Sequence, residues 1–145
     1  MTQFSITVEI QAPPERVWTV MRDVERWHEW TPSVKSIKRF GTGKLGVGSR
    51  LLIRQPKLPP AVWKIIELEE GRGFTSVSGI PWLLEVTAHH VIEKHNGGSK
   101  VTLEIQYAGL LGSLFSRMTR NINERYLAFE ANGLKERSES TIAHE

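Results

Sequence analysis

Residues 10–32 read IQAPPERVWTVMRDVERWHEWTP, and the rest of the chain is best interpreted from this stretch. The proline pair at 13–14 ends an extended segment, and a proline is tolerated in the first turn of a helix because its missing N–H would be unpaired there. Apolar residues then recur at helical spacing, which predicts a short helix. A second short helix is predicted between Asp23, its expected N-cap, and Pro32.

Strands are predicted on both sides of this stretch. Residues 4–10 alternate apolar and polar side chains, the pattern of a strand with one buried face. Six further strands are predicted between turn signals, at 34–40, 48–55, 62–69, 73–78, 83–94 and 99–108. The sequence Asn96-Gly97-Gly98 favours a tight hairpin, because these residues accept positive φ.

The last part of the chain predicts one long amphipathic helix. Its apolar stripe recurs every three or four residues and comprises Phe115, Met118, Ile122, Tyr126, Phe129 and Gly133. A twisted antiparallel sheet is curved, and this helix is the large apolar element available to cover the concave face. We therefore expect an α+β fold, with a curved seven-stranded antiparallel sheet wrapped around a long C-terminal helix. The expected domain spans 1–138, followed by a polar tail at 139–145 that frays.

Composition narrows the function classes. The chain has 145 residues, of which 39% are hydrophobic and 24% charged, and its net charge is +3. Because there is no cysteine, thiolate catalysis, disulfides and cysteine-ligated metals are excluded. No apolar run is long enough to span a membrane, and the first residues do not resemble a signal peptide. We expect a cytoplasmic protein without integral membrane association.

The pattern resembles a known family. The resemblance rests on the opening stretch 10–32, on the pair Gly46 and Gly48, on Trp63, Arg72 and Phe74, on the block 97–103 (GGSKVTL), and on the terminal helix. Together these features resemble the START-like helix-grip (SRPBCC) superfamily, and within it the polyketide cyclase/dehydrase and lipid-transport group. The resemblance implies a helix-grip fold whose single domain holds an apolar or aromatic small molecule in a deep cavity. No cofactor is expected.

The apolar stripe of the helix and the facing strands supply candidate ligand contacts. The expected ligand-binding residues are Trp63, Phe74, Trp82, Val86, Leu103, Ile105, Tyr107, Phe115, Met118, Ile122 and Tyr126. The same residues would equally build a filled core, so the sequence leaves a packed interior and a lined pocket both open.

His90 is the best candidate for a general base. Alternation along 83–94 turns it inward, where a cavity would shield an imidazole that titrates near neutrality. Tyr107 and Tyr126, if also inward, would supply hydroxyl donors to a carbonyl or phenolate. The three residues would suit the aldol-type cyclisation and dehydration of the cyclases that the chain resembles. The alternative is a hydrogen-bonded histidine of the core, and no pair of carboxylates is apparent on the inward faces.

Two other sequence patterns could indicate a functional site, but the predicted structure around each argues against it. Residues 41–46, GTGKLG, match a dinucleotide-binding fingerprint, but a strand rather than a helix is predicted to follow, so the phosphate site would lack its helix N-terminus. His89 and His90 point to opposite faces of a strand, which argues against a metal site there. No metal is expected.

The charges predict a solvated surface. Four arginines of the last helix alternate with Glu124, Glu130 and Glu136, which argues against a nucleic-acid partner and leaves open a weak attraction to anionic membrane. The expected state is a monomer or homodimer. The leading hypothesis is a binding or carrying protein for a lipid, polyketide or similar molecule, and the alternative is a polyketide aromatase/cyclase or dehydratase.

Overall fold

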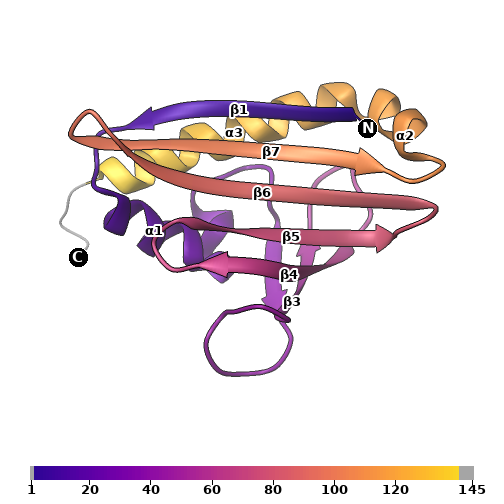
Figure 1. Cartoon of the computed structure of the whole chain (residues 1–145), viewed down its shortest axis with the longest axis horizontal. Helices are drawn as coiled ribbons and strands as arrows, with labels where there is room; N and C mark the ends of the chain where they lie inside the picture. Colours follow the sequence, from indigo (N-terminus) through magenta and orange to yellow (C-terminus); the bar gives the residue numbers. More distant parts are fainter. Residues whose placement is uncertain (1, 141–145) are drawn as a thin grey trace.

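The computed structural model of the chain describes residues 2–140. Its elements are β1 (Thr2–Ile10), α1 (Pro14–Arg22), the 3-10 helix η1 (Val24–Glu29), β2 (Ser36–Arg39), β3 (Arg50–Arg54), β4 (Ala61–Glu69), β5 (Gly73–Ile80), β6 (Leu84–His95), β7 (Gly98–Ala108), α2 (Gly112–Met118) and α3 (Arg120–Glu139). The strands form one antiparallel sheet in the order β1-β7-β6-β5-β4-β3-β2 (Figure 1). The predicted α+β class and the seven strands are confirmed, with strand bounds within two residues of the prediction.

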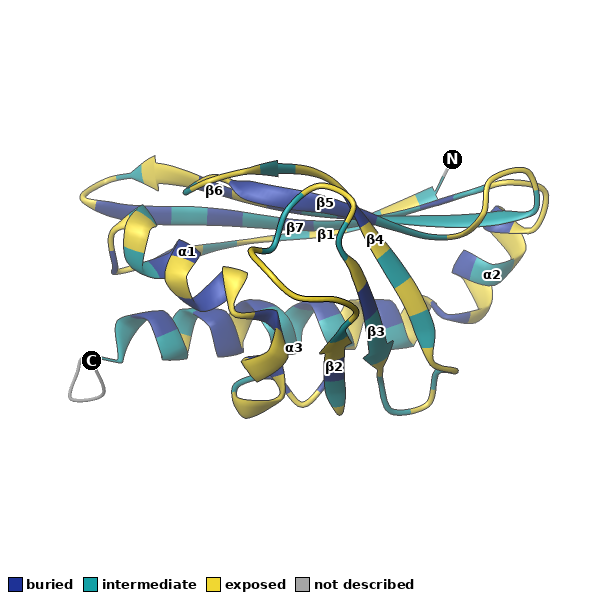
Figure 2. Ribbon diagram, turned by 90° about the horizontal axis from the view of Figure 1, so that it is seen from below, coloured by how far each residue is buried: buried dark blue, intermediate teal, exposed yellow. Residues whose placement is uncertain are grey.

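The sheet is strongly curved around α3. Figure 2 shows α3 lying along one face of the sheet, while β4, β3 and β2 bend toward the helix. Strand β4 has an irregular register between Ile65 and Glu67, where its pairing with β5 shifts. Such a bulge bends a strand and increases its twist. The bend brings the β2–β4 part of the sheet around the side of α3.

The hairpin between β6 and β7 has the predicted turn. Asn96 and Gly97 both have positive φ, 46° and 80°, and His95 pairs with Gly98 across the turn. These angles fit the tight two-residue turn that long antiparallel strands favour. The turn therefore sets the register of the two longest strands, and with it the direction of their inward side chains.

The short helices close one part of the concave face. Val17 and Met21 of α1 are fully buried, and Trp27 of η1 donates its indole N–H to the carbonyl of Met21 at 2.9 Å. Asp23 occupies the N-cap position of η1 as predicted, but its side chain makes no capping hydrogen bond and instead pairs with Arg26 at 3.5 Å. The packing of Trp27, rather than a cap, holds η1 in place.

The predicted terminal helix is divided in two at Thr119. The Thr119 hydroxyl donates to the carbonyl of Phe115 at 2.8 Å, a back-bond that bends helices, and α3 starts in a new direction after it. The buried face of α3 also differs from the predicted stripe, because it consists of Asn123, Leu127, Ala131, Gly133, Leu134 and Ser138. Helix α3 runs to Glu139, and residues 141–145 of the predicted tail lie outside the described residues.

Candidate functional site

A cavity lies between the concave face of the sheet and α3. Its outer pocket has a volume of about 210 Å³ and is lined by residues of β4, β5, β6, β7, α2 and α3, together with the loop before β4. A smaller inner pocket of about 70 Å³ lies against η1, β2 and β3. The two pockets adjoin, because they share wall residues, namely Gln55, Trp63, Ile105 and Glu130.

The walls are mainly apolar and carry several aromatic rings. Alternation along the strands turns every second side chain inward, so β6 contributes Leu84, Val86, Ala88 and His90 to the two pockets. Trp63, Tyr107, Phe115 and Tyr126 surround the outer pocket. Apolar walls with a few polar groups are typical of small-molecule sites.

The most chemically distinctive contact is between His90 and Glu130. The imidazole Nε2 lies 2.7 Å from a carboxylate oxygen of Glu130, and the two side chains are only 9% and 17% exposed. The Nδ1 atom of His90 is buried without a hydrogen-bond partner within the described residues. A neutral imidazole that donates Nε2–H to the carboxylate would hold its basic lone pair on Nδ1.

Aromatic rings hold this imidazole in place. The ring of Phe74 stacks on His90 with centroids 4.6 Å apart and planes 13° apart, and the ring of Trp27 lies 5.3 Å from it. All three residues line the inner pocket together with Glu130. The pair is therefore preorganised by packing from the sheet and from η1.

Tyr107 belongs to a buried hydrogen-bond chain. Its hydroxyl donates to the side-chain oxygen of Asn123 at 2.9 Å, and the Asn123 amide donates to the Thr119 hydroxyl at 3.1 Å. Burial raises the pKa of Tyr107 above its ordinary value, although hydrogen bonds with Thr119 and Asn123 act in the opposite direction. The hydroxyl stays protonated, but its proton is committed to Asn123.

Tyr126 is bound to the loop between β3 and β4. Its hydroxyl donates to the carbonyl of Pro56, and burial raises the pKa of Tyr126, while the charge of Arg125 acts against the increase. This contact joins α3 to the loop at the rim of the outer pocket. Both tyrosines therefore use their protons within the protein in this arrangement.

The predicted ligand-binding residues divide into two groups. Those that line the cavity are Trp63, Phe74, Val86, Ile105, Tyr107, Phe115 and Tyr126, and His90 lies beside them. The others lie outside both pockets. Trp82 and Met118 are 68% and 72% exposed, Leu103 is 1% exposed in the core, and Ile122 is half-buried on α3.

Glu130 is the main residue that the sequence analysis missed. It was assigned to a solvated face of the last helix, whereas it lies three residues after the buried Leu127 and reaches His90. The available signal was the spacing of Asn123, Leu127, Ala131 and Leu134, which marks a second face of the helix. Asn123 and Gln55, which also line the cavity, were missed as well.

Residue 90 faces inward as predicted, and its neighbour His89 accepts or donates a hydrogen bond with Thr75 at 3.1 Å on the other face of the sheet. The GTGKLG segment is followed by strand β3, as predicted.

Across residues 2–140, no group of three or more histidine or acidic side chains is placed to hold a metal ion. Within the same residues, no helix is both long and apolar enough to cross a membrane.

Solved structures with the same fold include enzymes and other proteins. The Zhui aromatase/cyclase from Streptomyces sp. R1128 is 15% identical over 95% of this chain and 93% of its own, with a TM-score of 0.76. A protein from Thermus thermophilus is 19% identical over 94% and 97% of the two chains, with a TM-score of 0.73. The protein Ara h 8.0201 is 18% identical over 92% and 97%, with a TM-score of 0.60. At these identities the likeness shows the helix-grip fold.

Comparison of the sequence with known proteins and families identifies a family as well as a fold. No curated protein matches the chain significantly. A family model described as polyketide cyclase/dehydrase and lipid transport matches residues 1–139, which is nearly the whole chain and includes every residue of the cavity. The chain therefore belongs to the polyketide cyclase/dehydrase and lipid transport family.

Proposed function

We propose that this protein binds and carries an apolar or aromatic small molecule in the cavity between the sheet and α3. The observation that carries the proposal is the outer pocket, with its volume of about 210 Å³ and its aromatic walls. Membership of a family that includes lipid transport and polyketide chemistry supports a ligand of this class.

The wall residues suggest how such a ligand is held. Trp63, Tyr107 and Phe115 offer ring faces and edges for stacking against a flat apolar molecule. Gln55 and Glu130 stand where the two pockets adjoin, so a polar group of the ligand would be oriented there. A ring system in the outer pocket with one oxygen directed at this border fits the arrangement.

Two experiments test the proposal. Mass spectrometry of the intact protein purified from cells detects a retained ligand, and titration with lipids, polyketides and aromatic compounds measures binding. Binding is read from the fluorescence of the protein's tryptophans, because Trp63 lines both pockets. A Val86→Phe variant fills part of the outer pocket and is expected to weaken binding by about tenfold or more, equivalent to about 1.4 kcal/mol. Melting temperature is expected to be unchanged or higher.

The matched control is Thr87→Phe. Thr87 is the next residue of β6 and its side chain points to the opposite face of the sheet, so ligand affinity is expected to stay within twofold of the original chain. The proposal would be contradicted if Val86→Phe and Thr87→Phe lost ligand affinity equally. It would also be contradicted if the original chain retained no compound from cells and bound none in the screen.

A second candidate function is a polyketide aromatase/cyclase or dehydratase reaction in the same cavity. The buried pair His90 and Glu130 favours it, because a carboxylate that orients an imidazole is a common arrangement for general base catalysis. Aromatase/cyclases are also among the proteins of the same fold. The imidazole would take a proton from a methylene group between two carbonyls, and the resulting enolate carbon would attack a carbonyl of the same chain. The carbonyl π electrons would move to its oxygen as an alkoxide, and the imidazolium would return the proton to that oxygen, giving a hydroxyl group. In this arrangement the tyrosines orient the substrate rather than donate protons to it.

A further inference from the structure

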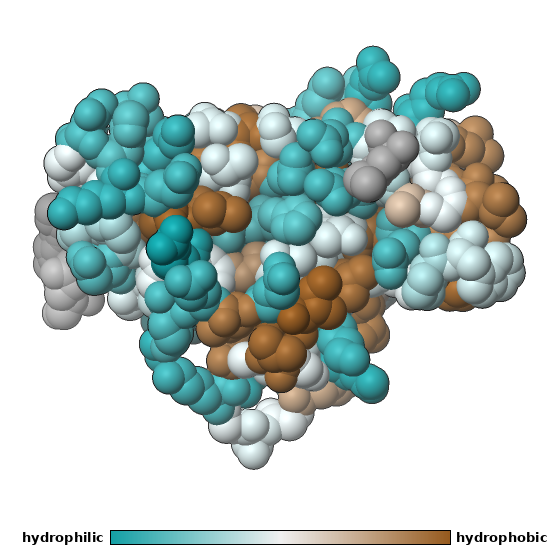
Figure 3. All heavy atoms as spheres, in the orientation of Figure 1, coloured by the Kyte–Doolittle hydropathy of each residue, from teal (hydrophilic) through white to brown (hydrophobic). Residues whose placement is uncertain are grey.

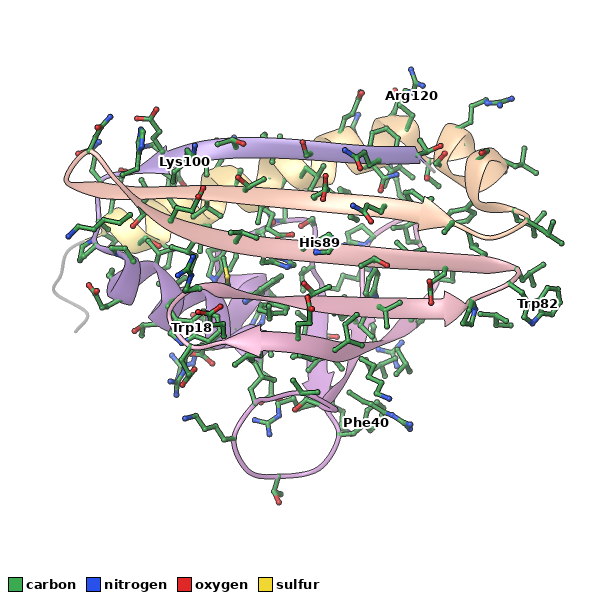
Figure 4. All side chains as sticks on the ribbon, in the orientation of Figure 1. Trp18, Phe40, Trp82, His89, Lys100 and Arg120 are labelled. Carbon is green, nitrogen blue, oxygen red and sulfur yellow. The ribbon has the colours of Figure 1, made fainter. Side chains whose placement is uncertain are left out.

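The end of the molecule at α2 carries a concentration of exposed apolar side chains. We define the tip patch as Ile80, Trp82, Leu110, Leu111, Leu114 and Met118, which are between 43% and 79% exposed. Figure 4 shows Trp82 projecting from this end, and Figure 3 shows hydrophobic residues gathered there. Exposed apolar groups that cluster in this way mark interaction surfaces.

The tip patch is built on a defined backbone. It comes from the β5–β6 turn, from the segment that joins β7 to α2, and from α2 itself, and the first two segments are hydrogen-bonded to each other. The amide of Leu110 donates to the carbonyl of Trp82 at 3.1 Å, and that of Leu111 donates to Leu83 at 2.8 Å. The apolar side chains therefore project from one connected surface rather than from separate mobile ends.

The segments that form the tip patch carry only positive charge, and the half-buried Glu85 lies at their edge, paired with Gly79 and Ala108 in the sheet. Residues 79–84 and 109–120, which include the whole patch, contain no aspartate or glutamate and have two arginines, Arg117 and Arg120. Both arginines are exposed, and Figure 4 shows Arg120 pointing away from the body of the molecule. Two exposed arginines beside exposed tryptophan, leucine and methionine complement an anionic lipid surface.

The tip patch also lies beside the cavity. Gly79 and Leu84 flank the β5–β6 turn and Phe115 belongs to α2, and all three line the outer pocket. The segments that would touch a bilayer are therefore the ones that form one wall of the outer pocket.

We propose that the tip patch docks on an anionic lipid surface. A lipid surface is favoured over a protein partner because the side chains project from two turns and a short helix instead of lining a groove. Tryptophan is also enriched at the boundary between headgroups and acyl chains. Docking does not depend on what occupies the cavity, so it can be tested separately from the proposed function.

Co-sedimentation of the full chain with vesicles is the direct test. Vesicles of phosphatidylcholine alone are compared with vesicles containing one quarter phosphatidylglycerol, at low and at physiological salt. We expect binding to the anionic vesicles that weakens as salt increases. Leu110→Glu and Met118→Glu are each expected to lower the partition coefficient by about tenfold or more, since an apolar contact is replaced by a repelled charge.

Two controls make the experiment specific. Val47 is 69% exposed in the loop before β3, outside the tip patch. Val47→Glu makes the same change in net charge as the two test variants, and it is expected to change vesicle binding by less than about twofold. Quenching of tryptophan fluorescence by brominated acyl chains is expected in the original chain and should fall in Trp82→Phe. Circular dichroism and melting temperature establish that each variant is folded.

Several results would overturn the proposal. The first is that the original chain does not bind anionic vesicles. The second is that Val47→Glu weakens vesicle binding as much as Leu110→Glu does. A third is a dimer in the ultracentrifuge that dissociates in Leu110→Glu, which would make the tip patch a contact between two copies. A fourth is binding of an acidic protein at this surface with no binding to vesicles.

Discussion

His89 and His90 are neighbours on β6 whose imidazoles lie on opposite faces of the sheet. His90 contacts Glu130 inside the cavity, and His89 bonds to Thr75 outside it. The two residues have the same chemistry and nearly the same position in the chain. They therefore form a natural pair for testing whether an imidazole in the cavity does chemical work.

If the second candidate function holds, His90→Ala is expected to lower the turnover of a poly-β-ketone substrate by about 10²–10⁴-fold, the range that a positioned base contributes. Glu130→Gln keeps a hydrogen-bonding group beside His90 but removes its charge, so turnover should fall while substrate affinity changes little. Turnover and affinity are measured separately. His89→Ala is the control and should retain full turnover. Undiminished turnover in His90→Ala would leave binding and carriage as the function of the cavity.

The direction of individual side chains could be predicted from the sequence only where the pattern is local. Alternation along β6 placed His90 inward, and its burial confirms this. Its partner Glu130 comes from α3, and no local pattern connects residues 40 positions apart. The exposure of Trp82 and Met118 was also missed, because an apolar residue is expected inside unless the surface itself requires it.

At the scale of elements, the strands and the hairpin turn followed from period-two alternation and from residues that accept positive φ, at 96 and 97. The terminal helix was predicted as one piece because its apolar spacing continues through Thr119. At the break the Thr119 hydroxyl donates to the carbonyl of Phe115, a side-chain contact that helical spacing does not reveal. The buried face of α3 begins with the polar residue Asn123, so a count of apolar residues favours the wrong stripe.

Helix α3 approaches the loop after η1 very closely at Gly133. A Cβ atom at this position would lie 1.9 Å from the carbonyl oxygen of Trp30, so Gly133→Ala must displace the helix or the loop. We expect a loss of roughly 1–3 kcal/mol in unfolding free energy, the usual cost of overpacking, although alanine is the better helix former.

Urea denaturation measures this effect, and Asn132→Ala is the control. Asn132 is exposed on the same turn of α3, and replacing it should stabilise the protein by a few tenths of a kcal/mol through helix propensity alone. A Gly133→Ala variant as stable as Asn132→Ala would mean that α3 does not pack on Trp30 as closely as described.

At the scale of the whole molecule, the two ends of α3 are held differently. At its C-terminal end Arg16 donates to the carbonyls of Arg137 and Ser138, at 3.1 and 3.3 Å, and Lys135 donates to the carbonyl of Glu9 at 2.8 Å. At the other end lie α2, the outer pocket and the tip patch. Element order alone predicted the sheet and helix, but a hollow interior depends on the side chains that meet across it.

Glu139 tests how much the polar end contributes to stability. One of its carboxylate oxygens accepts the backbone N–H of Gln11 at 2.7 Å and the ammonium of Lys135 at 2.8 Å. The bond from Gln11 is the main cause that holds the pKa of Glu139 below its ordinary value of 4.5, and Lys135 adds to it. The folded state therefore binds fewer protons than the unfolded state as the pH falls below that value. Glu139 stabilises the fold above about pH 4.5 and loses this contribution in acid.

Glu139→Gln is accordingly expected to be less stable than the original chain by about 1 kcal/mol at pH 7, because the amide makes weaker hydrogen bonds than the carboxylate. The difference should shrink as the pH falls through the pKa of the folded protein, where the original carboxyl is itself neutral. Denaturation in urea at several pH values from neutral to strongly acidic measures it, with Glu136→Gln, an exposed carboxylate on the same turn, as the control. A difference that stays constant over this range would show that the charge of Glu139 does not fasten α3 to the sheet, and that the contacts of Arg16 and Lys135 with the backbone are sufficient.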